Sequence, residues 1–162
     1  MGMWNVFPFG MWQVLLWSAL GNANADAKPL TLRAQSCISA AAAHHGINPV
    51  LLQAIIRHES RGNPQTVVRN KNGSIDVGLA GINSINFVQL RQHGVTPESL
   101  LDECVSAYVG AWKLSEKTRK FGNTWQAVGA YNSETPHFNQ RYQTLIFNEL
   151  MTMGVMLAPA KN

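Results

Sequence analysis

Residues 48–64, NPVLLQAIIRHESRGNP, decide the fold because they predict a helix that carries a carboxylate on its apolar face. Asn48 is a favourable N-cap, and Pro49 fits the first helical position, where its missing N–H would have no helical partner. The helix is expected over residues 50–60 and ends where glycine and proline follow. Because the sequence delimits this helix at both ends, the face on which each side chain lies can be assigned.

Glu59 continues the apolar stripe of this helix. Positions i, i+3, i+4 and i+7 are Leu52, Ile55, Ile56 and Glu59. Burial disfavours an ionised carboxyl group and raises its pKa, and a position near the helix C-terminus acts in the same direction. A carboxylic acid that stays protonated near neutral pH can protonate the leaving oxygen of a glycosidic bond. The alternative is a structural ion pair with Arg61 or another cation, although Arg57 points to a different helix face.

The rest of the chain predicts an α+β domain that is mainly α. Further helices are expected over residues 34–45, 84–93, 102–121, 125–132 and 136–153. A small β-hairpin is expected over residues 66–79, because Asn72-Gly73 favours a turn between two strand-like runs. The hairpin is thus inserted after the helix that carries Glu59, and a cleft is expected between the helices and this small sheet.

Two of the longer helices have distinct faces. In the helix over residues 102–121, one face carries Val105, Tyr108, Val109 and Trp112, and a basic stripe carries Lys113, Lys117 and Lys120. In the last helix, the residues expected to point inward are Phe138, Tyr142, Leu145, Ile146 and Leu150. The basic stripe is interpreted as a solvated helix face.

The first 25 residues form a separate segment without a charged side chain. Residues 23–25, Ala-Asn-Ala, match the A-x-A pattern that signal peptidases read. Residues 1–25 are therefore expected to be a signal peptide and residues 26–162 a single exported domain, with no membrane span after cleavage. An uncleaved anchor is the alternative, because no Lys or Arg precedes the apolar stretch.

Cysteines and net charge limit the setting and the partners. Cys37 and Cys104 both follow the leader, so one disulfide is expected, with two buried free thiols as the alternative. The net charge of +4 suits an anionic partner such as a cell wall, a membrane surface or nucleic acid. No nucleic-acid-binding motif accompanies the charge, so no nucleic-acid partner is predicted.

Other groups of reactive side chains are weaker candidates than Glu59. His58 and Ser60 flank it, but consecutive helical residues diverge and cannot form a Ser–His pair. The zinc-protease pattern H-E-x-x-H is incomplete, because glycine occupies its last position. His44 and His45 lack Cys or carboxylate partners at metal-binding spacing, and no phosphate-binding glycine loop is present. Neither a metal nor a cofactor is predicted.

Three sequence blocks, taken in order, resemble a known family. They are HESRGNP at 58–64, DVGLAGIN at 76–83 and AVGAYN at 127–132. Together they resemble the soluble lytic transglycosylase (SLT) catalytic domain, which has a lysozyme-like fold, and the resemblance covers roughly residues 34–150. The chain is most similar to the small specialised transglycosylases of type III and type IV secretion, conjugation and pilus systems. Those enzymes are exported and often carry a cysteine pair.

The resemblance implies roles for individual residues. Glu59 matches the family's catalytic acid, and Ser60 matches the neighbouring serine that orients this acid or the substrate's N-acetyl group. Substrate-binding positions are implied at Gly78, Leu79, Ile82 and Asn83. The missing side chain of Gly78 would let a sugar approach the backbone. Tyr131 and Asn132 match the pair that faces the acid, with the Tyr131 hydroxyl bonding its carboxyl group; simple core packing is the alternative for Tyr131.

Three positions depart from the family pattern. Ala80-Gly81 stands where the family usually has Met-Gln, and Glu134 stands where it often has Gly. Loss of the two larger side chains is expected to leave the cleft open, whereas Glu134 is expected to narrow one end of it or shift the sugar subsites. These departures favour weak activity or dependence on a partner.

The resemblance implies cleavage of peptidoglycan glycan strands by one glutamate, with formation of a 1,6-anhydro product and local opening of the wall for an envelope-spanning secretion, conjugation or pilus machine. A periplasmic location follows. Asp76 leaves a muramidase-type hydrolase open if its carboxyl group reaches the other side of the sugar, although a turn-stabilising hydrogen bond is favoured. A wall-binding assembly factor without turnover is another alternative, and a basic nucleic-acid binder is a third.

Overall fold

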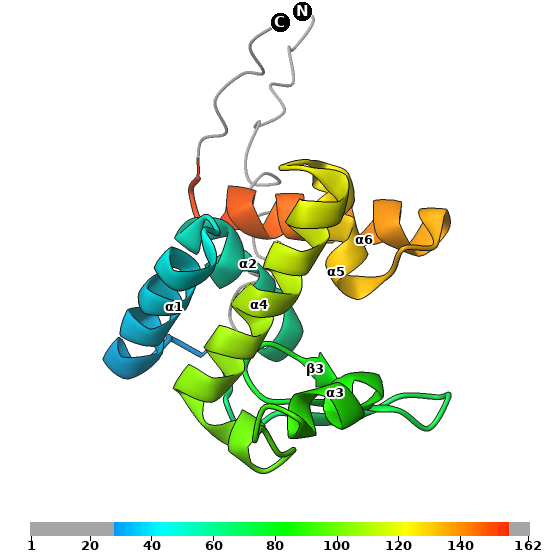
Figure 1. Cartoon of the computed structure of the whole chain (residues 1–162). Coiled ribbons are helices and arrows are strands. Elements are labelled where there is room, and N and C mark those ends of the chain that lie inside the picture. The colour runs from blue at the N-terminus through cyan, green and yellow to red at the C-terminus, as the bar shows by residue number, and fades with distance from the viewer. Residues whose placement is uncertain (1–27, 156–162) are drawn as a thin grey trace, which may run out of the picture.

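The computed structural model describes residues 28–155 and shows a mainly helical fold with one small sheet (Figure 1). The helices are α1 (Leu32–His45), α2 (Pro49–Ser60), α3 (Phe87–Arg91), α4 (Glu103–Phe121), α5 (Trp125–Asn132) and α6 (Pro136–Thr152), with short 3-10 turns η1 (Ser84–Asn86) and η2 (Ser99–Leu101). Helix α4 lies centrally, against α1 on one side and α5 on the other, while the sheet and α3 lie at one end (Figure 1). The predicted signal peptide lies outside the described residues.

Side-chain caps start the helices where the sequence predicts them. The Asn48 side chain accepts from the Val50 N–H at 2.9 Å, and Pro49 follows at the first helical position. Gly46 ends α1 in the left-handed conformation, with a φ of 67°. These caps satisfy backbone groups that a helix terminus leaves without partners, so the predicted boundaries of α1 and α2 are confirmed to within two residues.

The predicted hairpin is present, and it carries a third strand. Strands β1 (Val67–Arg69) and β2 (Ile75–Val77) pair antiparallel, and β2 pairs antiparallel with β3 (Ile82–Asn83) in the order β1-β2-β3. The predicted helix over residues 84–93 is shorter, because η1 occupies its first turn and the Asn83 side chain accepts from the Ile85 N–H at 3.0 Å. The sheet therefore turns directly into a short helix beside it.

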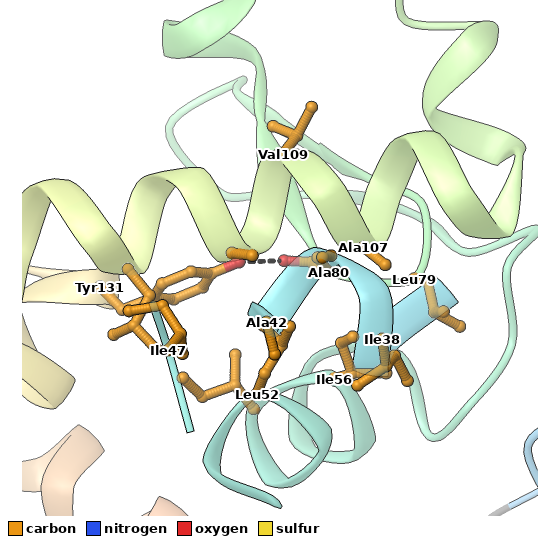
Figure 2. Packing of buried hydrophobic residues seen from close by; sticks show 14 of the residues in the cluster. Ile38, Ala42, Ile47, Leu52, Ile56, Leu79, Ala80, Ala107, Val109 and Tyr131 are labelled. Atoms are coloured by element: carbon orange, nitrogen blue, oxygen red, sulfur yellow. Dashed lines mark hydrogen bonds between the residues drawn. The ribbon is translucent and has the colours of Figure 1, made fainter. Parts of the chain in front are cut away.

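The core lies between α2, α4 and the turn that joins β2 to β3. The side chains of Leu52, Ile55 and Ile56 are fully buried, which confirms the predicted inner face of α2. Figure 2 shows Leu52 and Ile56 packed with Leu79 and Ala80 of the turn. The apolar stripe that ends in Glu59 is thus the stripe that seals the core.

On α4, the predicted apolar face is only partly buried, and Tyr108 is 38% exposed. The buried positions are Glu103, Ser106, Ala107, Val109, Gly110, Ala111, Leu114 and Ser115. Small side chains dominate this face because α4 packs against α1, α5 and the β2–β3 turn at once.

On α6, the prediction that Phe138 and Leu145 point inward is wrong, since they are 53% and 36% exposed. The buried positions are Asn139, Tyr142, Ile146 and Leu150. Asn139 takes the inward position because its side-chain amide donates to the carbonyls of Gln126 at 3.1 Å and Ser133 at 3.0 Å. A polar side chain that satisfies buried backbone carbonyls thus sets the rotation of α6.

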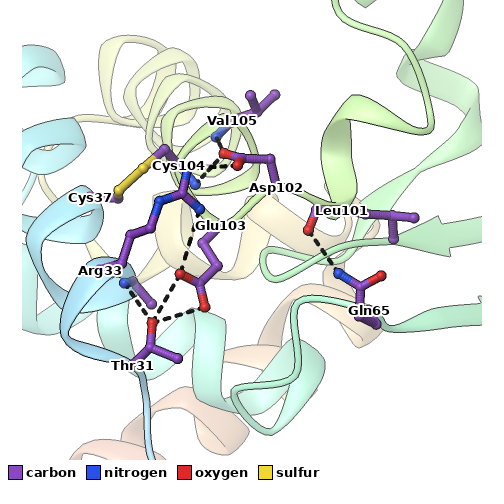
Figure 3. A network of polar contacts seen from close by, with 10 residues as sticks. Thr31, Arg33, Cys37, Gln65, Leu101, Asp102, Glu103, Cys104 and Val105 are labelled. Atoms are coloured by element: carbon purple, nitrogen blue, oxygen red, sulfur yellow. Dashed lines mark hydrogen bonds and ion pairs between the residues drawn. A yellow bond between two sulfur atoms is a disulfide. The ribbon is translucent and has the colours of Figure 1, made fainter.

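The predicted disulfide between Cys37 and Cys104 is confirmed, and it links α1 to the start of α4 (Figure 3). Polar contacts reinforce the same junction: the Thr31 hydroxyl lies 2.9 Å from both Glu103 carboxylate oxygens, and the Arg33 guanidinium donates to Asp102 at 2.7 Å. No helix among residues 28–155 is long and apolar enough to cross a membrane.

Candidate active site

Glu59 lies in the last turn of α2, with its side chain only partly exposed. The Tyr142 hydroxyl of α6 donates a hydrogen bond to Glu59 Oε1 at 2.5 Å. Burial raises the pKa of Glu59 to about 7, the hydrogen bond from Tyr142 and the charge of Lys113 oppose this rise, and the charge of Asp76 adds to it. A carboxyl group with this pKa can both donate and accept a proton near neutral pH.

Within residues 28–155, Glu59 is not part of a structural ion pair. Among the described residues no salt bridge reaches it, and Arg57 instead pairs with Glu149 of α6 at 2.7 Å. The ion pair holds α2 against α6, beside the hydrogen bond between Tyr142 and Glu59. The alternative that Glu59 forms a structural ion pair is therefore excluded for residues 28–155.

The predicted hydrogen bond between Tyr131 and Glu59 is not formed. The Tyr131 hydroxyl donates to the backbone carbonyl of Ala80 at 2.8 Å (Figure 2), and Tyr142 bonds the carboxyl group instead. The two tyrosine rings stack with centroids 6.3 Å apart. The helical spacing of Tyr142 predicts a core position; the signal for a further role is its hydroxyl, which needs a hydrogen-bond partner when the ring is buried.

The turn between β2 and β3 contains residues that the resemblance implies for substrate binding. Leu79 and Ile82 are fully buried, so their side chains support the turn from inside the core. A Cβ at Gly78 would lie 2.0 Å from the Leu100 carbonyl oxygen and 2.8 Å from Ser106 Oγ. The missing side chain of Gly78 therefore makes room for the protein's own backbone, and not for a sugar as predicted.

Gly81 is the glycine of this turn that borders the acid. A Cβ there would lie 2.5 Å from Glu59 Oε2, and the φ of Gly81 is +58°. The neighbouring Ala80 touches α4, where a Cβ at Gly110 would lie 2.7 Å from the Ala80 Cβ. The glycine at position 81 therefore does not simply leave the cleft open, as predicted. The Glu59 carboxyl group occupies the position where the Cβ of a larger residue would lie.

Asp76 of β2 has both carboxylate oxygens engaged. Asn83 Nδ2 donates to Asp76 Oδ1 at 2.7 Å, and Asn70 Nδ2 donates to Oδ2 at 2.8 Å. Asn83 Nδ2 also donates to Ser74 Oγ at 3.0 Å. The favoured hydrogen-bonding role of Asp76 in the hairpin is confirmed, and Asn83 is the side chain that joins β3 to it.

Ser60 and Asn132 lie at helix ends. Ser60 is buried, and its hydroxyl donates to the Ile56 carbonyl at 3.1 Å and accepts from the Gly62 N–H at 3.2 Å. Its hydrogen bonds therefore close the end of α2, one residue after Glu59. Asn132 ends α5, and its side chain is exposed.

The basic stripe of α4 is divided between two roles. Glu134 bonds Lys117 at 2.8 Å and Lys120 at 2.6 Å, and these lysines lower the pKa of Glu134 to about 2. Glu134 is thus tied to the outer surface of α4. Lys113 is not part of a solvated stripe as predicted: it is partly buried, and its Nζ lies 4.4 Å from the centroid of the Tyr131 ring.

Among residues 28–155 no group of three or more His, Cys, Asp or Glu side chains could hold a metal ion. Tyr142, Gly81 and Lys113 are the site residues that the sequence did not identify. All three are set by packing between elements distant in sequence, so a reading of single helices and turns does not detect them.

Comparison with known proteins agrees with this geometry. The family model described as "Transglycosylase SLT domain" matches residues 36–144. Invasion protein IagB of Salmonella typhimurium is 37% identical over 121 residues, 72% of this chain and 76% of that protein. Protein IpgF of Shigella flexneri is 38% identical over 100 residues, 61% of this chain and 66% of that protein.

Among solved structures, an inactive mutant of the lytic transglycosylase Slt from Pseudomonas aeruginosa matches 80% of this chain with a TM-score of 0.58. The sequence identity is 18%, so this match shows the fold. This chain spans a quarter of the length of that protein. The predicted lysozyme-like fold is confirmed.

Proposed function

The chain belongs to the transglycosylase SLT family and is a peptidoglycan lytic transglycosylase, and from this premise we propose that Glu59 is the only catalytic carboxyl group of the reaction. The observation that carries the proposal is the environment of Glu59. Its pKa lies at about 7 through burial, a single tyrosine hydroxyl bonds it, and no cation among the described residues pairs with it. One group with this proton affinity suits two successive proton transfers.

In the proposed mechanism, protonated Glu59 donates its proton to the β-1,4 oxygen between N-acetylmuramic acid and N-acetylglucosamine as the bond to that oxygen breaks. The oxygen of the muramic N-acetyl group stabilises the electron-poor carbon that remains. Ionised Glu59 then takes the proton of the muramic C6 hydroxyl, whose oxygen bonds to that carbon and closes a 1,6-anhydro ring. The intramolecular nucleophile is already in place, which favours ring closure over attack by water.

The engagement of Asp76 supports one catalytic carboxyl group over two. Hydrolytic glycosidases use a second carboxylate as nucleophile or base. Both Asp76 oxygens accept hydrogen bonds from Asn70 and Asn83, and these bonds hold the carboxylate in the hairpin. We therefore assign Asp76 to the hairpin, and a muramidase in which it acts on the sugar is the alternative that product analysis tests.

The remaining predicted site residues have supporting roles in this proposal. Leu79 and Ile82 fix the β2–β3 turn from the core, and Ser60 closes the helix end that presents Glu59. Tyr131 fixes the Ala80 carbonyl of the same turn. Exposed Asn132 is the most accessible of these side chains for contact with the glycan.

Of the two other candidates, Gly78 shapes the turn by admitting the Leu100 carbonyl, and Asn83 joins the turn to Asp76. These contacts support an indirect role in substrate binding, in which both residues set the path of the backbone that borders Glu59.

Acting on peptidoglycan requires a periplasmic or extracellular location. We propose that residues 1–25 direct export to the periplasm and that residues 26–162 form the mature single domain. One relative carries the name invasion protein, which supports local opening of the wall for an envelope-spanning secretion, conjugation or pilus machine.

The test is product analysis on purified peptidoglycan with the wild-type protein, Glu59→Gln and the control Glu116→Gln. Glu116 is a carboxylate of α4 whose side chain is 42% exposed, and its exchange matches the chemical change. We expect anhydro ends from the wild type and the control, and no products from Glu59→Gln. Undiminished cleavage by Glu59→Gln would remove Glu59 from the mechanism. Reducing ends without anhydro ends would identify a muramidase, and glycan pull-down without products would identify a wall-binding factor.

A further inference from the structure

Lys113 of α4 lies against a pair of tyrosines, one of which, Tyr142, bonds the acid. Its Nζ is 4.4 Å from the centroid of the Tyr131 ring, within the range of a cation–π interaction. The Tyr131 ring stacks on Tyr142 at an interplanar angle of 18°, and the Tyr142 hydroxyl donates to Glu59. A positive charge from α4 thus lies on the ring that neighbours the tyrosine bonded to the acid.

Within the described part of the chain, Lys113 differs from the other lysines of its stripe because no oxygen atom pairs with it. Lys117 and Lys120 share the Glu134 carboxylate, whereas Lys113 makes no hydrogen bond or ion pair with any residue in 28–155. Burial lowers the pKa of Lys113, while the charges of Glu59 and Asp76 oppose the decrease. Because Lys113 has no direct partner among these residues, a structural ion pair does not explain its position. Burying an ammonium group in this way is costly.

The charges that face Glu59 come from several elements. Lys113 of α4 favours the ionised carboxyl group, and Asp76 of β2 disfavours it. From α6, Tyr142 bonds the carboxyl group, and Tyr131 of α5 backs Tyr142.

On α2 itself, the Arg57 charge is paired with Glu149, and burial lowers the pKa of His58, whose ring contacts Tyr142 edge-on at 5.4 Å. Lys113 is therefore the cation that opposes the negative charge of Asp76 at this centre.

Resting on the proposed function of Glu59, we propose that Lys113 is a positioning residue whose ammonium group stabilises the carboxylate that forms when Glu59 gives up its proton. The Tyr131 ring holds the ammonium near the centre, and among residues 28–155 no ion pair joins it to Glu59. A direct ion pair would keep the carboxyl group ionised and unable to act as an acid. A cation held near the acid but not bonded to it eases proton release while leaving the acid protonated beforehand.

The test compares Lys113→Met, which removes the charge from a side chain of similar length, with Lys113→Arg, which keeps it. The matched control is Lys120→Met on the exposed part of the same stripe. Two quantities are measured on the full mature chain: the titration of the Glu59 carboxyl carbon by 13C NMR, and the pH profile of kcat/KM on purified peptidoglycan.

We expect Lys113→Met to move the Glu59 titration and the alkaline limb of the profile to higher pH, because removal of the cation disfavours ionised Glu59. Lys113→Arg should restore both toward the wild-type position, and Lys120→Met should coincide with the wild type. Lys113→Gln gives the same test if the methionine variant does not fold.

Titration curves of Lys113→Met and wild type that coincide would overturn the inference. A rise in KM with the limb unmoved would also overturn it, because Lys113 would then be a substrate contact. The NMR titration needs no turnover, so its result stays separate from the test of the proposed function, which rests on the products formed by the wild type and by Glu59→Gln.

Discussion

Removing the Tyr142 hydroxyl is the sharpest perturbation of the acid. In Tyr142→Phe the ring remains, and only the group that donates to Glu59 Oε1 at 2.5 Å is lost. Tyr142 is 3% exposed, so water has little access to replace the lost donor. Because the hydrogen bond lowers the pKa of Glu59, its removal should raise that pKa above the present value of about 7.

The size of the effect follows from the difference between the two protonation states. A hydrogen bond to a charged acceptor contributes about 1.5–3 kcal/mol, and one to a neutral acceptor about 0.5–1.5 kcal/mol. The difference of about 1–1.5 kcal/mol corresponds to about one pKa unit. The alkaline limb of kcat/KM, which reports loss of the proton from the general acid of the free enzyme, should move up by about one pH unit.

The assay is release of soluble glycan fragments from purified peptidoglycan across the pH range, with Tyr131→Phe as control. The Tyr131 hydroxyl bonds the Ala80 carbonyl, so its loss should lower the free energy of unfolding by about 1 kcal/mol and leave the limb in place. If the limb moved in Tyr131→Phe and stayed fixed in Tyr142→Phe, the assignment of the two tyrosines would be refuted.

Three further perturbations test neighbouring parts of the structure. Asp76→Asn removes a charge that raises the pKa of Glu59, so the alkaline limb should move to lower pH, opposite in sign to Tyr142→Phe; an unmoved limb would show that this charge does not act on the acid. Gly81→Ala places a Cβ against Glu59 Oε2 at a positive φ, so unfolding free energy should fall by about 1–2 kcal/mol in urea titrations, and turnover should fall further than the unfolded fraction explains. Replacing Cys37 and Cys104 together by Ser opens a link across 67 residues and should cost about 4 kcal/mol of unfolding free energy relative to the disulfide-bonded wild type; the reduced wild type is the control and should show the same loss.

Local sequence signals predicted the helical part of the fold well. The Asn48-Pro49 start of α2 and the Gly46 end of α1 are determined by caps that involve only neighbouring residues. The rotation of α6 was not predictable in this way, because Asn139 points inward to bond carbonyls of the α5 region. Apolar periodicity alone gives a polar residue no reason to occupy the core, and the prediction for Phe138 failed for that reason.

The candidate acid was predictable, whereas its partners were not. Glu59 follows from helical spacing within α2, which is a local pattern. Its contacts come from α6 through Tyr142, from α4 through Lys113 and from the β2–β3 turn through Gly81. Each of these contacts depends on how two elements pack, and the family pattern indicated Tyr131 where packing selects Tyr142.

The contact between Gly110 and Ala80 limits how this enzyme can be redesigned. A methyl group on Gly110 would lie 2.7 Å from the Ala80 Cβ and 3.3 Å from the Tyr131 hydroxyl, so the two positions share one small volume. Grafting the longer Met-Gln pair onto residues 80 and 81 would drive α4 outward and carry Lys113 with it. A mutagenesis library built for higher turnover should therefore vary positions 80, 81 and 110 together. Single exchanges toward the commoner residues would lower stability and turnover before any combination could raise them.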